Sequence, residues 1–240
     1  MIPLLRSEFR KLFTIRSTYI ISGIALLLIT FISFYVMGYK GVAENPELLM
    51  SAARVPTHVI AVLISIVAIL LMTHEYRYNT IMYTLTSSNS RSKVLLAKIL
   101  VVSTYVLAFT AFAIVYSIVM ARIGVMVKGV PLVPQQMYYW DVIWKSLFYV
   151  WANAMTGLLF AALFRHVVGA IVAIFVIPST VEPLLGLVLK ENTKYLPFTA
   201  LEQVNMGAAL SPGKGAAIFL IYLAAGWIVA WVLFLKRDAN

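Results

Sequence analysis

The sequence predicts an all-α integral membrane protein with six transmembrane helices and an N-terminal amphipathic helix at the membrane interface. Hydrophobic residues make up 62% of the 240 positions and the mean hydropathy is +0.93, whereas soluble domains contain roughly 45–50% apolar residues. Only 12% of the residues are charged, and long uncharged stretches separate them, as expected where hydrocarbon excludes charge. A water-soluble core could not absorb this surplus of apolar side chains, so lipid must cover them.

Residues 1–16 are predicted to form an amphipathic helix that lies in the headgroup plane. The apolar side chains recur at helical spacing and the polar ones lie opposite. The apolar positions are Ile2, Leu5, Phe9, Leu12 and Phe13, and the polar positions are Arg6, Ser7, Arg10, Lys11 and Thr14. Two roles fit this segment, namely anchoring the first span and gripping a partner.

The spans are predicted from uncharged stretches, since about 20 helical residues cross roughly 30 Å of hydrocarbon. Five such stretches are continuous and predict spans at about 17–39, 56–74, 97–121, 144–164 and 214–235, the last three of which include a lysine at or next to their first residue. A sixth, at 166–189, is interrupted by Pro178, Glu182 and Pro183. No long soluble linker or internal repeat divides the chain, so residues 1–240 are predicted to form a single transmembrane domain.

The distribution of Lys and Arg predicts that both termini lie in the cytoplasm. With the N-terminus inside, the density of Lys and Arg is about twofold higher in the inner segments than in the outer ones, as the positive-inside rule requires. The net charge of +10 belongs to residues that flank apolar spans rather than to a patch on a soluble domain, so nucleic acid is not an expected partner. We expect a multi-pass protein of the cytoplasmic membrane, with lipid around it.

Two polar stretches carry a resemblance to a known family. The first contains Glu75-Tyr76-Arg77, Thr80-Ile81, Leu85, Arg91 and Leu96-Ala97-Lys98, and the second reads Glu8-x-x-Lys11-x-x-x-x-Arg16. In this respect the chain resembles the permease subunits of type-2 ATP-binding-cassette (ABC) transporters, whose ATPase is a separate polypeptide. It departs from them at 87–90, where Ser-Ser-Asn-Ser stands and relatives usually place a proline before the arginine.

The resemblance implies that the loop after the second span forms a coupling helix that docks into a groove on the ATPase. The residues expected to bind this partner are Tyr78, Ile81, Met82, Tyr83 and Leu85, and aromatic side chains bordered by arginine are common anchors of interfaces. The alternative is a loop helix that packs back against the bundle. Glu75, Arg77 and Arg91 are expected to brace the ends of the second and third spans, or else to form a solvated cluster.

Glu182 is the acidic residue expected near membrane depth. A charge at the bilayer centre costs about 2.5–3.5 kcal/mol on insertion scales, and the flanking Pro178 and Pro183 interrupt helical hydrogen bonding. Relatives often have a re-entrant hairpin between the fifth and sixth spans, and residues 178–196 suit one. Glu182 is therefore expected either near an outer gate or at the outer surface.

No catalytic or metal-binding residue is predicted. The stretch from Gly207 to Lys214 resembles a P-loop, but five residues separate its first glycine from Gly213-Lys214, whereas a P-loop has four. Gly215 stands where a P-loop has the Ser or Thr that binds magnesium. His74-Glu75 is followed by Tyr78 where a zinc protease has its second histidine. The chain has no cysteine and hence no thiolate metal site. No cofactor is expected on this chain, and ATP and Mg are expected on the partner ATPase.

The function expected is that of the permease subunit of an ABC exporter, which moves its substrate with ATP hydrolysed by a separate subunit. A homodimer or another pair of permeases is expected. The pairs Gly157/Ala161 and Gly169/Ala173 allow helices to approach closely, between subunits or within one. Two alternatives remain at this stage: an ion- or proton-coupled secondary transporter, and a non-transporting scaffold or sensor subunit.

Overall fold

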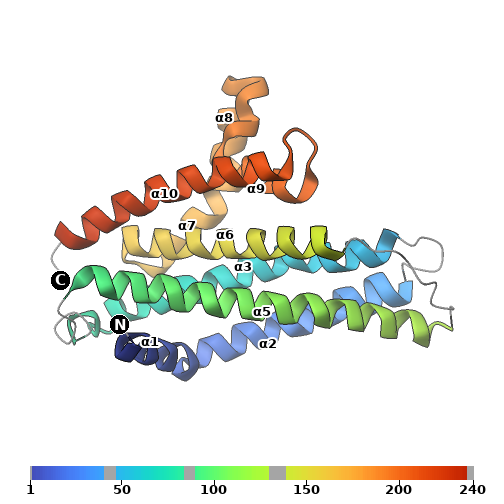
Figure 1. The fold of residues 1–240 in the computed structure, drawn as a ribbon, viewed down its shortest axis with the longest axis horizontal. Helices are drawn as coiled ribbons and strands as arrows, with labels where there is room; N and C mark the ends of the chain where they lie inside the picture. Colours follow the sequence, from blue (N-terminus) through green and yellow to red (C-terminus); the bar gives the residue numbers. More distant parts are fainter. Residues whose placement is uncertain (1, 41–46, 84–89, 130–138, 237–240) are drawn as a thin grey trace.

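The described residues form helices and no strand. A computed structural model describes residues 2–40, 47–83, 90–129 and 139–236. The helix α1 (Ile2–Thr14) leads into α2 (Arg16–Thr30), which continues as the π-helical segment η1 (Phe31–Lys40). The long helices α3 (Glu47–Arg77), α5 (Arg91–Val127) and α6 (Tyr139–Phe164) run beside α2 along the long axis of the molecule (Figure 1).

Six helices of the described chain are long and apolar enough to cross a membrane, which confirms the predicted fold class. They are Arg16–Val36, Pro56–Arg77, Arg91–Val127, Trp140–Phe164, Val167–Tyr195 and Pro212–Lys236. The start of α1 and the end of α10 (Pro212–Lys236) lie at the same end of the molecule (Figure 1). The chain is therefore a multi-pass membrane protein.

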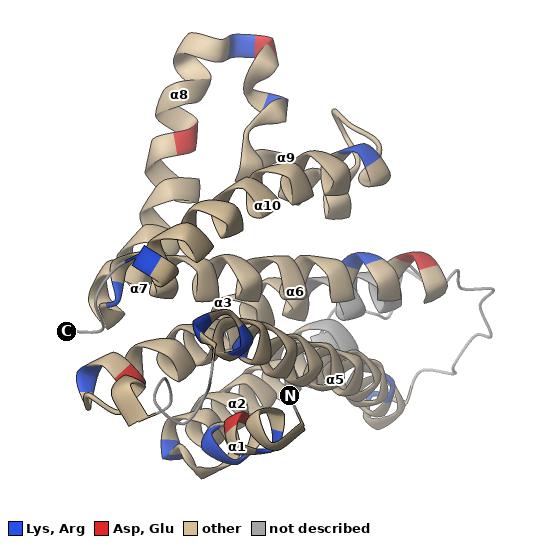
Figure 2. Ribbon diagram, turned by 60° about the vertical axis from the view of Figure 1, so that its left-hand side comes forward, with Lys and Arg blue, Asp and Glu red and all other residues tan. Residues whose placement is uncertain are grey.

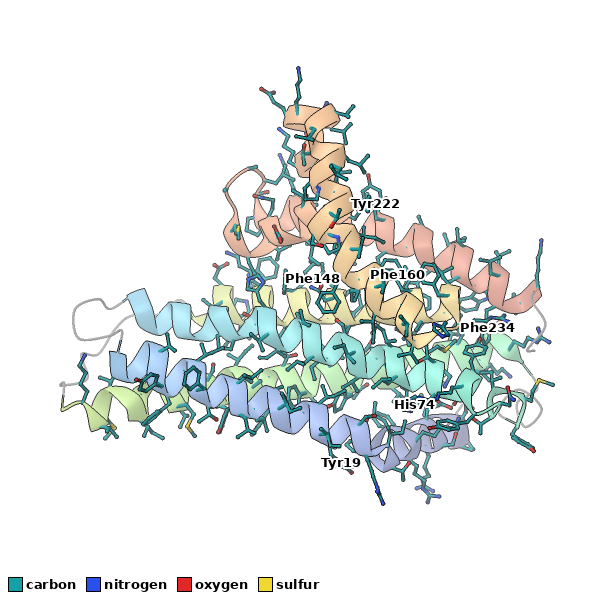
Figure 3. The ribbon with its side chains drawn as sticks, turned by 180° about the vertical axis from the view of Figure 1, so that it is seen from behind. Tyr19, His74, Phe148, Phe160, Tyr222 and Phe234 are labelled. Atoms are coloured by element: carbon teal, nitrogen blue, oxygen red, sulfur yellow. The ribbon has the colours of Figure 1, made fainter. Side chains whose placement is uncertain are left out.

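The centre of the bundle is the contact between α3 and α6. Gly157 of α6 lies so close to α3 that a Cβ there would stand 3.0 Å from the carbonyl oxygen of Ser65, and Ala161 is fully buried. The first predicted small-residue pair therefore packs within one subunit. The helix α6 also packs against α10, where Phe148 of α6 (labelled in Figure 3) meets Phe219 edge to face with ring centroids 6.5 Å apart. Tyr19 of α2, in contrast, points away from the bundle (Figure 3) and is 58% exposed, as a lipid-facing residue would be.

The fifth span is broken, as the sequence predicts. The helix α7 (Val167–Val176) passes through the π-helical segment η2 (Ile177–Val181) into α8 (Glu182–Leu189). Proline lacks the N–H that an α-helix would use here, and a local π-helix accommodates that loss. The chain then turns through η3 (Lys190–Tyr195), and α9 (Pro197–Met206) returns toward α10 (Figure 1). The chain thus turns back on itself between α8 and α9, where the sequence predicts a hairpin, and the re-entry of this hairpin into the membrane remains a prediction.

Candidate functional site

Four charged side chains from three helices meet at the end of the bundle that carries α1. Lys11 Nζ lies 2.6 Å from Glu8 Oε1 and 2.6 Å from Glu75 Oε1. Lys98 Nζ lies 2.8 Å from Glu8 Oε2 and 2.8 Å from Glu75 Oε1. Each ammonium group therefore bridges two carboxylates, and each carboxylate binds two ammonium groups. We call Glu8, Lys11, Glu75 and Lys98 the charge quartet.

Three of the four residues of the charge quartet are buried, and the Lys11 side chain is 33% exposed, so pairing within the quartet is decisive for the three. Glu8 and Lys98 are fully buried and Glu75 is 5% exposed. An isolated buried charge is very unfavourable, whereas a closed set of two positive and two negative groups is tolerated because each charge has its counter-ions in contact. Glu8 and Lys11 lie on α1, Glu75 on α3 and Lys98 on α5. The quartet therefore fixes α1 to the ends of the second and third spans, and the mixed charges of α1 are visible in Figure 2.

The pKa shifts of the two α1 residues follow from this pairing. Burial alone would raise the pKa of the Glu8 carboxyl, but Lys98 and Lys11 outweigh burial and lower it below 4.5. Burial alone would lower the pKa of the Lys11 ammonium, but its hydrogen bonds to Glu75 and Glu8 raise it above 10.5. Both groups are therefore charged throughout the physiological range of pH.

We predict that attachment of α1 is insensitive to pH in the neutral range and is lost at both extremes. Because the pKa of Glu8 is lowered on folding, its contribution is present above 4.5 and disappears as pH falls through the lower folded value. Because the pKa of Lys11 is raised, its contribution is present below 10.5 and disappears as pH rises through the higher folded value. Thermal unfolding in detergent should show a plateau between these limits. A marked transition between about pH 6 and 8, where only histidine ordinarily titrates, would contradict this assignment.

The loop after α3 displays an aromatic surface at the same end. Tyr78 is 63% exposed, Met82 45% and Tyr83 78%, and we call these three residues the loop surface. Ile81, which the sequence analysis grouped with them, is 1% exposed and supports the loop from inside. Leu85 lies outside the described residues. Three of the five expected partner-binding residues are therefore presented on the surface of the molecule.

Each of the three residues expected to brace this region has a defined contact. Glu75 belongs to the charge quartet. The Arg77 guanidinium carbon stands 5.6 Å from the ring centroid of Tyr78, a distance typical of cation–π pairs. Arg91 Nη1 donates a hydrogen bond of 3.2 Å to the carbonyl oxygen of Leu235 at the end of α10. These contacts connect the base of the loop with the last helix as well as with α1.

Glu182 serves as a cap within the hairpin. It is 3% exposed, and its Oε1 accepts a hydrogen bond of 2.7 Å from the Phe198 backbone N–H. Its Oε2 accepts bonds of 2.7 Å and 2.8 Å from the Thr199 backbone N–H and hydroxyl. A carboxylate at a helix N-terminus satisfies donors that have no partner within the helix and also interacts favourably with the helix dipole. Glu182 thereby joins α8 to the start of α9, and a role at an outer gate remains a prediction.

Replacing Glu182 with alanine is predicted to loosen α9 selectively. The backbone N–H groups of Phe198 and Thr199 would lose their acceptor, and an unsatisfied buried donor costs about 1–3 kcal/mol. Hydrogen exchange of α9 should accelerate while α3 and α6 remain protected. The control is Glu191→Ala, because Glu191 lies at the exposed tip of the same hairpin. Equal exchange of α9 in both variants would show that the cap contributes nothing.

A cavity of about 250 Å³ lies between α3, α6, the broken fifth span and α9. Its polar lining residues are Ser65, Tyr149, Asn153, Ser179 and Glu202, among apolar neighbours such as Ile174 and Phe198. His58 Nδ1 and the Tyr149 hydroxyl are 3.0 Å apart beside it. A mixed lining of this kind is typical of small-molecule sites.

The profile of a family described as ABC-2 family transporter protein matches residues 4–189 of the chain. The matched region contains the charge quartet, the loop surface and Glu182, and it ends with α8. No curated protein matches the chain.

Proposed function

The chain belongs to the ABC-2 family of transporter proteins, and from this membership we propose that it is the transmembrane permease subunit of an exporter powered by a separate ATPase. The family and the six apolar helices make it a membrane permease of an ABC transporter. Transport by such a subunit draws on ATP hydrolysed elsewhere. We propose three further properties: the direction of transport, the contact with the ATPase and the orientation in the cytoplasmic membrane.

The observation that carries the proposal is the braced loop surface. Tyr78, Met82 and Tyr83 are large side chains exposed beyond the end of a span. Interfaces with partner proteins are enriched in Tyr, Met and Arg. The charge quartet holds the root of this loop to α1, α3 and α5 at once, so a force applied to the loop surface would reach three helices together.

This arrangement suggests how ATP binding by the partner would change access through the membrane. Closure of two ATPase subunits would push on the loop surfaces of two permeases and shift the equilibrium between inward-open and outward-open states. The cavity between α3, α6 and α9 is proposed as the place where the substrate makes contact. Rigid attachment of the loop is required, because a flexible loop would absorb the displacement.

Two permeases are proposed to act together. Only 11% of the apolar stretch of the fifth span is buried, compared with 17%, 67%, 33%, 61% and 22% for the other five spans in chain order. The helices α7 and α8 diverge from the other helices (Figure 1). A second permease seated against α8 would cover such side chains as Leu187 and Val188, which are 76% and 80% exposed. Native mass spectrometry in mild detergent should show a dimer, and monomer alone, with or without the ATPase, would oppose this.

The proposed orientation makes a simple topological prediction. A reporter active only in the cytoplasm should function when fused after Asn240, and a cysteine introduced by Ser51→Cys should react with an impermeant thiol reagent applied from outside. Both results follow from the positive-inside distribution. A C-terminal reporter that is active only outside the cytoplasm would require an odd number of spans.

The experiment that tests the proposed function is recovery of the partner. The chain should be purified through an affinity tag from its native membrane, and the bound proteins identified by mass spectrometry. We expect an ABC ATPase at a stoichiometry of one per permease, and ATP hydrolysis by the purified complex. A protein recovered repeatedly without any ATPase, together with ion-driven uptake or efflux in vesicles, would favour a secondary transporter.

A further inference from the structure

A second and larger cavity, of about 610 Å³, opens at the end of the bundle that carries α1. It lies between the end of α3 and the turn from α6 to α7, and its lining residues are Leu70, Thr73, Tyr76, Arg77, Asn79, Arg165, His166, Val167 and Val168. Its volume falls within the roughly 300–1,000 Å³ of ligand sites. The transport function proposed above assigns no role to this cavity.

The charge of the cavity is positive. Arg77 and Arg165 both line it, and none of these lining residues is acidic. The Arg165 guanidinium carbon stands 5.2 Å from the ring centroid of Tyr76, so a cation–π contact helps to orient it. The N-terminus of α7 borders the cavity at Val167, where backbone N–H groups carry partial positive charge. The lining is therefore suited to an anion, and Arg is the side chain that best matches a phosphate group.

The backbone is strained at one residue of this cavity. Arg165 has φ +56°, in the left-handed region that residues other than Gly, Asn and Asp rarely adopt. Asn79, which also lines the cavity, has φ +54°, a conformation that asparagine tolerates. Strained residues cluster where function requires a particular placement of groups. Here the strain at Arg165 places a guanidinium group at the cavity wall.

The cavity also lies where apolar helices begin or end. Three of the six spans do so beside it, at Arg77, Phe164 and Val167, so it is expected near the edge of the hydrocarbon. Its apolar wall includes Leu70 and Val168, and Val168 is 60% exposed on the outer surface of the bundle. In Figure 2 the ribbon positions of Lys and Arg, coloured blue, include several at this end, on α1, on α10 and near the start of α7. An anion that enters here therefore meets basic groups at headgroup level and apolar side chains toward the hydrocarbon.

We propose that this cavity binds the phosphate-bearing headgroup of an anionic phospholipid, with the acyl chains lying along the exposed face of α7. Soluble phosphate offers the same charge but would leave the apolar wall without a partner. Arg77 borders both the cavity and the ring of Tyr78, so the bound lipid would steady the base of the loop surface. Assignment to the inner leaflet depends on the orientation proposed above, whereas the binding itself does not.

The test is lipid binding to the purified permease without its ATPase, followed by native mass spectrometry. The protein is stripped of lipid in detergent and titrated with phosphatidylglycerol or phosphatidylcholine. We expect one phosphatidylglycerol per chain, held roughly tenfold or more tightly than phosphatidylcholine, because each nearby Lys or Arg contributes on the order of 1 kcal/mol to binding of anionic lipid. The variant Arg77→Gln/Arg165→Asn should lose this preference. Asparagine is chosen at 165 because it tolerates positive φ.

Two further variants separate this site from general attraction. The variant Arg6→Gln/Arg10→Gln removes two exposed charges of α1 at the same end. It should still bind phosphatidylglycerol more tightly than phosphatidylcholine. Arg77→Lys/Arg165→Lys keeps the charge and should retain most of the preference, and a melting temperature of the Gln/Asn variant close to that of the wild type would show that its loss of the preference is not a folding defect. Two results would overturn the proposal. The first is equal binding of the two lipids by the wild type. The second is displacement of phosphatidylglycerol by millimolar inorganic phosphate at constant ionic strength, since the site would then serve a soluble anion. Because the ATPase is not in the assay, neither result depends on the docking of that subunit.

Discussion

Replacing Lys98 with methionine is expected to lower the free energy of unfolding by about 3–5 kcal/mol, because it removes one partner from a buried ion cluster. Methionine fills a similar volume, so the loss is electrostatic rather than a matter of packing. Glu8 would keep only Lys11 as a counter-ion, and Glu75 likewise. The expected observations are a lower melting temperature in detergent and faster hydrogen exchange of α1, because α1 depends on the quartet for its attachment.

The matched control for this substitution is Lys93→Met, on the same helix and exposed to solvent, which should change the melting temperature little. A double-mutant cycle with Glu8→Gln should give a coupling energy of about 0.5–3 kcal/mol, the range found for residues in one ion-pair network. Additive effects of the two substitutions would mean that Glu8 and Lys98 do not interact in the folded protein.

The second large effect is expected at the loop surface. Changing both Tyr78 and Met82 to aspartate should abolish association with the ATPase, because charging a buried interface anchor typically costs about 2 kcal/mol or more. Both side chains are exposed in the free permease, so the variant should insert and fold normally. Co-purification of the ATPase, permease-stimulated ATP hydrolysis and export should fall together.

A control of the same chemistry is available at the opposite end of α5. Met126 and Val127 are each 62% exposed, and changing both to aspartate should leave ATPase association intact. If the Tyr78 and Met82 variant binds and stimulates the ATPase at wild-type levels, the loop surface is not the docking site. If both variants lose the ATPase, the substitutions act through misfolding.

The fold was largely predictable from the sequence because hydrocarbon excludes charge over whole segments. Uncharged stretches predicted the six spans, helical periodicity predicted α1, and the two prolines predicted the break in the fifth span. The predicted third span began at 97, however, whereas α5 begins at Arg91 and includes the buried Lys98. A lysine can lie inside the protein there because carboxylates from α1 and α3 meet it.

The site was predictable in its parts but not in its assembly. Glu8, Lys11, Glu75 and Lys98 all stood in the motifs that suggested the family, yet nothing in their spacing shows that they meet, since contact requires three helices to converge. The cap that Glu182 provides for α9 depends in the same way on the hairpin. Ile81 was grouped with the exposed aromatic residues because residue type alone does not show which side of a short helix faces inward. The signal that could have found Lys98 was a charge within an otherwise apolar helix.

The most direct test of the ATPase contact is a photo-crosslink from Tyr83. This residue is 78% exposed on the loop surface, and Trp140 provides an aromatic control, 77% exposed at the start of α6. A photoreactive phenylalanine analogue at each position, irradiated in native membranes, would capture whatever lies within reach. The proposal predicts a covalent adduct between position 83 and an ABC ATPase, and none from position 140. Irradiation of position 83 that yields only lipid adducts or none, in membranes where the ATPase is present, would contradict it.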